Sequence, residues 1–115
     1  LYKNFQMDTK QLGVAPRING GLLSNFQGKY VTLVGKVLNQ NGQIATFEAS
    51  DGQQVTVQLS PGQHYNSQYV EITGEVNSDL TVRELKSCEY GDSFNMENYE
   101  GLVKLATGRF SSLFY

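Results

Sequence analysis

Apolar and polar residues alternate with a period of two along much of the chain from residue 30 to residue 90. This pattern is typical of strands with one buried face. It predicts five β-strands: a long first strand that starts at Tyr30, then residues 44–49, 54–59, 69–76 and about 80–90. Gly35 interrupts the first strand, and a glycine in this place indicates a β-bulge or a sharp bend.

Turn residues divide these strands into groups. Asn41-Gly42 and Asp51-Gly52 predict tight turns between the first three strands, whereas Ser60-Pro61-Gly62 breaks the pattern before the fourth. A three-strand meander, a longer connection and a hairpin form the layout of a five-stranded OB-fold barrel, so we expect an all-β core. A five-stranded SH3-like barrel is the main alternative, although it accommodates a terminal helix less readily.

The N-terminal part of the chain has a different pattern. Ile18, Leu22, Leu23 and Phe26 share one helical face, although Gly20-Gly21 weakens a helix here, so we expect a short helical turn across the end of the barrel. Three parts are expected. Residues 1–15 form a disordered leader or tag remnant, with Met7 as the natural start. Residues 16–92 form the barrel with its helical turn, and residues 93–115 form a C-terminal α-helix.

The C-terminal segment has helical periodicity. Asn95 is a favourable N-cap, and Glu97 places a negative charge in the first turn. Apolar residues recur at alternating spacings of three and four, which is typical of a helix that packs against another helix. We interpret this seam as a partner-binding surface made of Met96, Tyr99, Val103, Ala106, Phe110 and Leu113.

Further apolar residues flank the seam. Leu102, Leu105 and Phe114 lie outside it, so apolar surface extends over more than half of the helix. A helix that folds back onto its own barrel is the alternative, but a small barrel offers only one contact face. Partner helices on more than one side would account for the remaining apolar residues.

The order of several landmarks along residues 16–115 resembles one known family. They are Pro16-Arg17-Ile18-Asn19, Leu23, Phe26, Val34-Gly35-Lys36-Val37, Ser50-Asp51-Gly52, Val70-Glu71, Gly74, Val76, Phe94-Asn95 and Tyr99. The family is that of the small (third) subunits of eukaryotic replication protein A, a heterotrimeric complex that binds single-stranded DNA. The resemblance implies a nuclear structural subunit. Its last helix would join helices of the middle and large subunits in a three-helix bundle, and the complex would serve DNA replication, repair and recombination.

Charge argues against strong DNA binding by the barrel itself. Residues 29–90 carry four cationic and seven acidic residues, so this region has a net charge of −3. If Phe47 points inward, the outer faces of the second and third strands present no aromatic ring and no cation, which are the groups that hold single strands on an OB-fold. Auxiliary DNA contacts are possible only at Lys29, Tyr30, Lys36, Arg83 and Lys86, and solvated charges with a rim tyrosine are the simpler explanation.

The sequence offers no basis for catalysis or for a cofactor. His64 and Cys88 are the single histidine and cysteine, and neither has a nucleophile or metal-ligand pattern nearby. No apolar run approaches the roughly 18 residues that span a membrane, and the lone cysteine favours a reducing intracellular compartment. We therefore expect a protein that is not an enzyme. A free-standing OB-fold domain that binds nucleic acid or another ligand, and an adaptor unrelated to DNA, are the alternatives.

Overall fold

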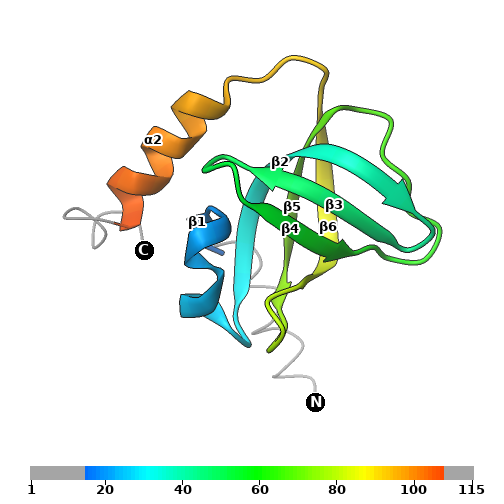
Figure 1. Cartoon of the computed structure of the whole chain (residues 1–115), viewed down its shortest axis with the longest axis horizontal. Coiled ribbons are helices and arrows are strands. Elements are labelled where there is room, and N and C mark those ends of the chain that lie inside the picture. The colour runs from blue at the N-terminus through cyan, green and yellow to red at the C-terminus, as the bar shows by residue number, and fades with distance from the viewer. Residues whose placement is uncertain (1–14, 108–115) are drawn as a thin grey trace.

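The computed structural model describes residues 15–107. The chain begins there with strand β1 (Arg17–Ile18) and the 3₁₀ helix η1 (Gly20–Phe26). Five strands follow, β2 (Tyr30–Asn41), β3 (Ile44–Ala49), β4 (Gln54–Gln58), β5 (Tyr69–Val76) and β6 (Val82–Gly91), and then helix α2 (Met96–Thr107) (Figure 1). The predicted strands correspond to β2–β6. The sequence did not reveal β1, because two residues carry no measurable periodicity.

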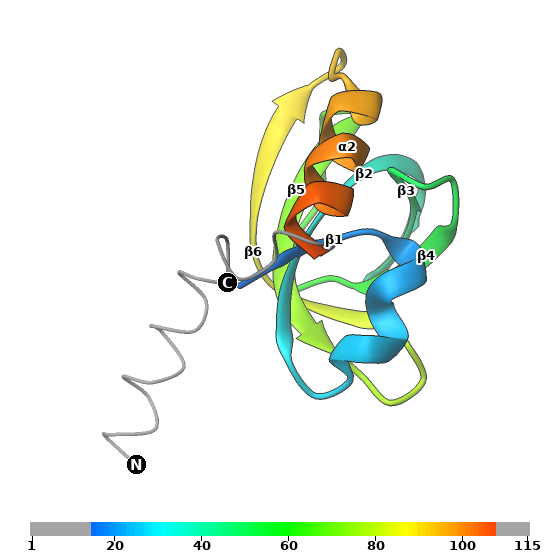
Figure 2. The same cartoon turned by 90° about the vertical axis from the view of Figure 1, so that its left-hand side faces the viewer.

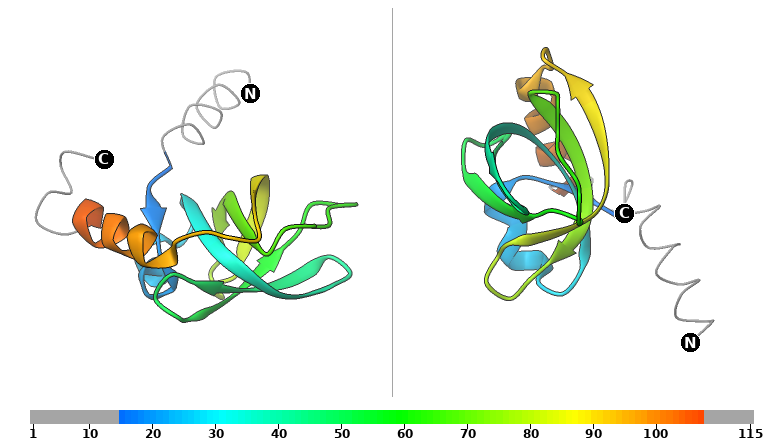
Figure 3. Two further views of the ribbon diagram at one scale, coloured as in Figure 1. Left: turned by 90° about the horizontal axis from the view of Figure 1, so that it is seen from above. Right: turned by 90° about the vertical axis from the view of Figure 1, so that its right-hand side faces the viewer.

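The strands pair in the order of an OB-fold. The sheet runs β1-β2-β3-β4-β6-β5, and an additional pairing of β2 with β5 closes the last five strands into a ring (Figure 3). All pairs within the ring are antiparallel except β4 with β6, which are parallel. The predicted all-β core with a helical turn before it and a helix after it is confirmed. The predicted leader lies outside the described residues, and the predicted domain boundaries stay predictions.

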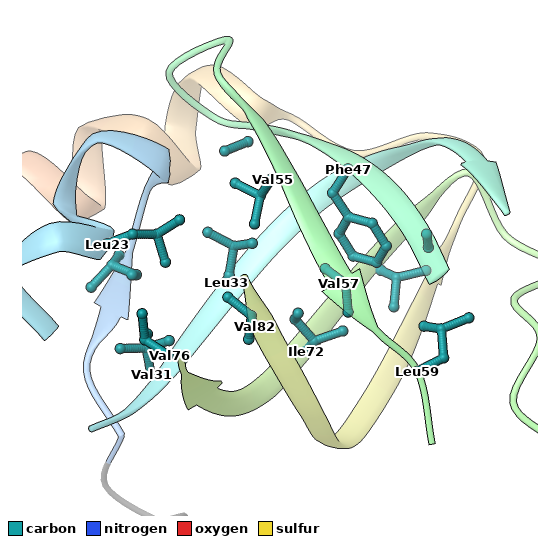
Figure 4. Close-up of a cluster of buried hydrophobic side chains, with 14 of the residues drawn as sticks. Leu23, Val31, Leu33, Phe47, Val55, Val57, Leu59, Ile72, Val76 and Val82 are labelled. Atoms are coloured by element: carbon teal, nitrogen blue, oxygen red, sulfur yellow. The ribbon is translucent and has the colours of Figure 1, made fainter. Parts of the chain in front are cut away.

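The core lies inside this ring, where alternate side chains of every strand meet (Figure 4). Phe47 is fully buried and packs edge-on against Tyr65, with ring centroids 5.7 Å apart. The predicted register of the 44–49 strand is therefore right, since a slip by one residue would have turned Phe47 outward. The other buried apolar residues of this cluster include Ile18, Leu23, Val31, Leu33, Ala45, Ala49, Val55, Val57, Leu59, Val70, Ile72, Val76 and Val82.

Gly35 marks the place where β2 changes partners. Strand β2 pairs with β5 from Tyr30 to Lys36 and with β3 from Gly35 onward, so Gly35 belongs to both ladders. A Cβ here would lie 2.7 Å from a ring carbon of Phe47. The glycine thus lies where β2 changes partners and where the Phe47 ring leaves no room for a side chain, whereas the register shift falls three residues later, between Val37 and Asn39.

The two ends of the barrel are closed differently. Helix η1 covers one end with Leu23, and the connection after β4 covers the other with Tyr65, whose hydroxyl donates to the buried Glu84 carboxylate. Burial would raise the pKa of Glu84, but hydrogen bonds from Tyr65 and Ser60 outweigh it and lower this pKa. Within residues 15–107, no helix is long and apolar enough to cross a membrane.

Candidate functional site

Helix α2 begins as its sequence predicts. The Asn95 side-chain oxygen accepts a hydrogen bond from the Asn98 backbone N–H at 3.0 Å, which makes Asn95 the N-cap. The rings of Phe94 and Tyr99 lie 6.4 Å apart, so an apolar contact brackets the first turn. The helix follows a linker from β6 and lies against β1, η1 and the outer side of β2 (Figure 2).

The inner face of α2 packs against the chain's own barrel. Val103 is fully buried and Tyr99 is 5% exposed, and both contact the buried Val34 of β2. The Tyr99 hydroxyl donates to the backbone carbonyls of Ile18 and Thr32, each at 3.3 Å. Burial raises the pKa of Tyr99, which keeps this hydroxyl protonated as the donor. Val34 sits on the outer side of β2, and it is buried because α2 covers it.

This packing corrects part of the predicted seam. Tyr99 and Val103 were expected to contact a partner, but in this structure they contact their own barrel, as in the alternative of a helix that folds back. Met96 is half-buried beside them. Apolar residues at alternating spacings of three and four indicate that one side of a helix is packed. The spacing does not show whether a helix or a sheet lies opposite that side. Ala106 belongs to α2, whereas Phe110, Leu113 and Phe114 lie outside the described residues.

The outer face of α2 remains apolar and exposed. Leu102 is 41% exposed and Leu105 is 46% exposed, and we call this pair the outer stripe. Both were predicted as residues that flank the seam. Tyr99 and Val103 are already buried within the chain. Among the described side chains of α2, the outer stripe therefore supplies the large apolar groups that are exposed to a partner.

Helix α2 is tied to the barrel by one carboxylate that the sequence analysis did not identify. Glu100 accepts hydrogen bonds from the Asn19 side-chain amide at 3.1 and 3.2 Å and from the Ser50 hydroxyl at 2.6 Å. Next to it, the Asp51 carboxylate accepts from the backbone N–H groups of Gly20 and Gly21 at the start of η1. The available signal was the resemblance, since Asn19, Ser50 and Asp51 belong to its landmarks.

A second polar cluster lies at the start of α2. Glu71 of β5 accepts from Arg17 at 2.7 Å and from the Tyr90 hydroxyl at 2.6 Å. Burial would raise the pKa of Glu71, but the hydrogen bonds from Tyr90 and Arg17 outweigh it and lower this pKa. Burial and the contact with Glu71 raise the pKa of Tyr90 to about 12. The glutamate is therefore ionised at neutral pH and fixes the positions of both side chains.

A groove of about 590 Å³ opens beside this cluster. It runs between the first turns of α2 and the end of β6, and Leu102 of the outer stripe forms part of its wall. The groove is lined by Arg17, Tyr90, Ser93, Phe94, Asn95, Asn98, Tyr99 and Leu102.

The β3–β4 face lacks the features of a single-strand binding surface. With Phe47 and its neighbours inside the barrel, the outward positions of these two strands carry no aromatic ring and no cation. This agrees with the sequence-based prediction. These positions are occupied by Ile44, Thr46, Glu48, Gln54, Thr56 and Gln58.

The candidate DNA-contact residues lie elsewhere. Four of them lie at outward positions on the two strands that pair with β5: Tyr30 and Lys36 on β2, and Arg83 and Lys86 on β6. Lys29 directly precedes β2. Arg83 donates to Glu75 at 2.7 Å, so its charge is partly balanced. Lys36 pairs with Glu48 of β3 and Arg83 pairs with Gln58 of β4, so these two cations border the β3–β4 face. Contact of any of the five residues with DNA stays a prediction.

The single cysteine lies on the surface of the sheet. Cys88 is an exposed thiol on β6. Among residues 15–107, no three His, Cys, Asp or Glu side chains are arranged to hold a metal ion.

Comparison with known proteins agrees with these features. Residues 7–114 match the family model described as Replication factor A protein 3. The chain is 36% identical to a replication protein A 14 kDa subunit of Arabidopsis thaliana, over 94% of this chain and 99% of that protein. It is 32% identical to the replication protein A 14 kDa subunit of Oryza sativa subsp. japonica, over the same shares of both chains.

A solved structure shows the same fold. The structure of U. maydis replication protein A bound to single-stranded DNA contains a chain that matches with a TM-score of 0.83 and 26% identity. The match covers 87% of this chain and 94% of that one. Sequence, fold and the helix that follows the barrel thus lead to one conclusion: the chain belongs to the Replication factor A protein 3 family, the small subunits of replication protein A.

Proposed function

We propose that this chain is a non-catalytic structural subunit that assembles with the middle and large subunits of a replication protein A complex. Helix α2 would join one helix from each of those subunits in a three-helix bundle. The complex would bind single-stranded DNA in the nucleus and serve DNA replication, repair and recombination.

The outer stripe is the observation that carries this proposal. Leu102 and Leu105 present adjoining apolar side chains on a helix whose other face is already buried. Burying the exposed part of these two leucines is worth roughly 1–3 kcal/mol before the costs of association. A helix held rigidly on a barrel presents such a stripe with little further loss of conformational entropy, which favours a stable assembly.

The proposal assigns DNA binding mainly to the other subunits. The β3–β4 face of this chain offers neither stacking rings nor cations, so we expect the isolated chain to bind single strands weakly at physiological salt. The candidates Lys29, Tyr30, Lys36, Arg83 and Lys86 would add only auxiliary contacts within the assembled complex.

The test is co-expression with the middle and large subunits, followed by size-exclusion chromatography with mass determination. Leu102→Asp combined with Leu105→Asp should abolish the heterotrimer, because each change places a charge in an apolar interface. The thermal midpoint of the isolated chain should change little, since both positions are exposed.

Lys104→Glu is the matched control. Lys104 lies on the same helix with its side chain 74% exposed, and its substitution also adds negative charge. It is 3.9 Å from Glu100, and the loss of such an exposed ion pair costs little. This variant should assemble normally. A heterotrimer that forms equally well with both leucines replaced would contradict the proposed role of the outer stripe.

A further inference from the structure

The groove beside α2 is lined by aromatic rings, with polar side chains at its rim. Its apolar walls are the rings of Tyr90, Phe94 and Tyr99, and Tyr90 and Phe94 lie 5.0 Å apart. Ser93 and Asn98 add polar groups at the exposed rim. Aromatic walls with a few polar groups are typical of sites that take up a side chain or a small segment of a partner.

The charge of the groove has one sign. Among the described residues that line it, Arg17 is charged and none carries a carboxylate. Glu71 balances Arg17 but is the more buried member of the pair, with a side chain 19% exposed against 43% for Arg17. The cation therefore faces the groove, while its counter-charge lies beneath.

The acidic residues nearest in sequence do not line the groove. The Asp92 carboxylate accepts a hydrogen bond from the Gln68 backbone N–H at 3.0 Å, and Glu97 lies in the first turn of α2 without lining the groove. Glu100 is engaged by Asn19 and Ser50. An occupant with a negative group would thus meet a complementary surface.

The groove is also continuous with the outer stripe, since Leu102 belongs to both. An occupant that extends from the groove to the outer stripe must combine apolar groups, which cover the stripe, with a negative group, which faces the groove. A polypeptide segment meets this requirement, whereas a nucleic acid strand has no aliphatic part to cover Leu102 and Leu105.

We propose that the groove binds an acidic, apolar segment of a partner protein, adjoining the helix that packs on the outer stripe. An aromatic or aliphatic side chain of that segment fills the space against Tyr90 and Phe94, and a neighbouring carboxylate faces Arg17. This inference rests on the proposed function, because it extends the same interface beyond α2.

Opposite charges placed at one rim position test the proposal. Asn98 is exposed, and its backbone N–H makes the cap contact that either substitution preserves. Asn98→Asp should weaken assembly of the full chain with the middle and large subunits by on the order of tenfold, through like-charge repulsion. Asn98→Lys should leave the affinity unchanged or raise it. The difference should shrink as salt rises from about 50 to 500 mM, as expected for a rim charge.

The helix itself responds in the opposite direction, which separates binding from stability. A carboxylate in the first turn of α2 favours the helix and an ammonium disfavours it, because the N-terminal end of a helix carries a partial positive charge. A loss of assembly in Asn98→Asp therefore cannot result from a weaker helix. Equal affinities of the two variants, or a loss confined to Asn98→Lys, would overturn the inference.

Two further results distinguish the remaining explanations. If Asn98→Asp weakens binding of an oligothymidine by the assembled complex while assembly is unchanged, the occupant is nucleic acid and the inference fails. If Leu102→Asp abolishes assembly while the Asn98 variants behave alike, the proposed function stands and the groove has no part in it.

Discussion

The two faces of helix α2 contain similar residues but have different surroundings. Tyr99 and Val103 on the inner face are buried against Val34, and the Tyr99 hydroxyl is hydrogen-bonded to the barrel. Leu102 and Leu105 on the outer face are more than two-fifths exposed. The inner face therefore determines where the helix lies, and the outer face determines what the helix offers to another chain.

This difference separates stability from assembly within a single element. A change on the inner face should alter the free energy of unfolding of the chain alone. A change on the outer face should alter the affinity for partners and leave unfolding nearly as it was. The following predictions test that separation, from the largest expected effect to the smallest.

Val103→Glu should produce the largest effect. It places a carboxylate at a fully buried position among apolar side chains, so we expect a loss on the order of 3–5 kcal/mol in the free energy of unfolding. Urea denaturation of the isolated chain measures this loss. Leu102→Glu, one residue earlier and exposed, is the control and should fall within about 0.5 kcal/mol of the parent. Equal effects of the two substitutions would contradict the assignment of the faces.

Glu71→Gln should alter how stability depends on pH. The pKa of Glu71 is lower in the folded chain than its ordinary value of 4.5. Its contribution is therefore complete above that value and is lost as the pH falls through the folded pKa. The parent should lose stability more steeply than Glu71→Gln below about pH 4.5. Chemical denaturation between pH 7 and pH 3 provides the two profiles, and parallel profiles would show that this cluster contributes nothing.

Tyr99→Phe should have a moderate effect on the inner face. It removes the hydroxyl that donates to the Ile18 and Thr32 carbonyls but keeps the ring, so we expect a loss of about 0.5–1.5 kcal/mol. Thermal and urea unfolding of the isolated chain should detect it. Affinity for the partner subunits should remain within about threefold, since the outer stripe is untouched. A larger loss of affinity than of stability would show that the faces are not independent.

Gly101→Ala should give a small gain. A Cβ at this exposed helical position meets nothing within 4 Å, and alanine favours a helix over glycine by about 0.8–1.0 kcal/mol. The helical circular dichroism signal and the thermal midpoint should both rise slightly. Gly74→Ala is the contrasting case, because its Cβ would lie 2.3 Å from the Arg83 carbonyl oxygen and should destabilise the barrel.

The barrel was largely predictable because its strands are long and each buries one face. Alternation placed Phe47, Val57 and Ile72 inside correctly, and turn residues supplied the grouping that identifies the OB-fold. Gly35 indicated the place where β2 changes partners, although the bulge falls at residue 38, where no glycine marks it. Local patterns suffice wherever a residue's environment is fixed by its own strand.

The attachment of α2 was not predictable in the same way. Val34 occupies a position that alternation assigns to the outer face, and nothing within β2 shows that a helix 60 or more residues later covers it. The contacts of Glu100 with Asn19 and Ser50 join three segments that are far apart along the chain. Such contacts depend on tertiary geometry, which no spacing rule contains, and only the resemblance drew attention to these residues.

The hydroxyl of Tyr99 also has a consequence for the order of events during synthesis. It bridges carbonyls 81 and 67 residues earlier in the chain, so its binding site exists only after the barrel has formed. A helix of 12 residues has little stability by itself, and α2 leaves the ribosome after every strand of the barrel. The inner face is thus covered as soon as it emerges, while Leu102 and Leu105 remain on the surface of the folded chain. The order of synthesis therefore means that the buried residues of α2 never wait for a barrel to pack against.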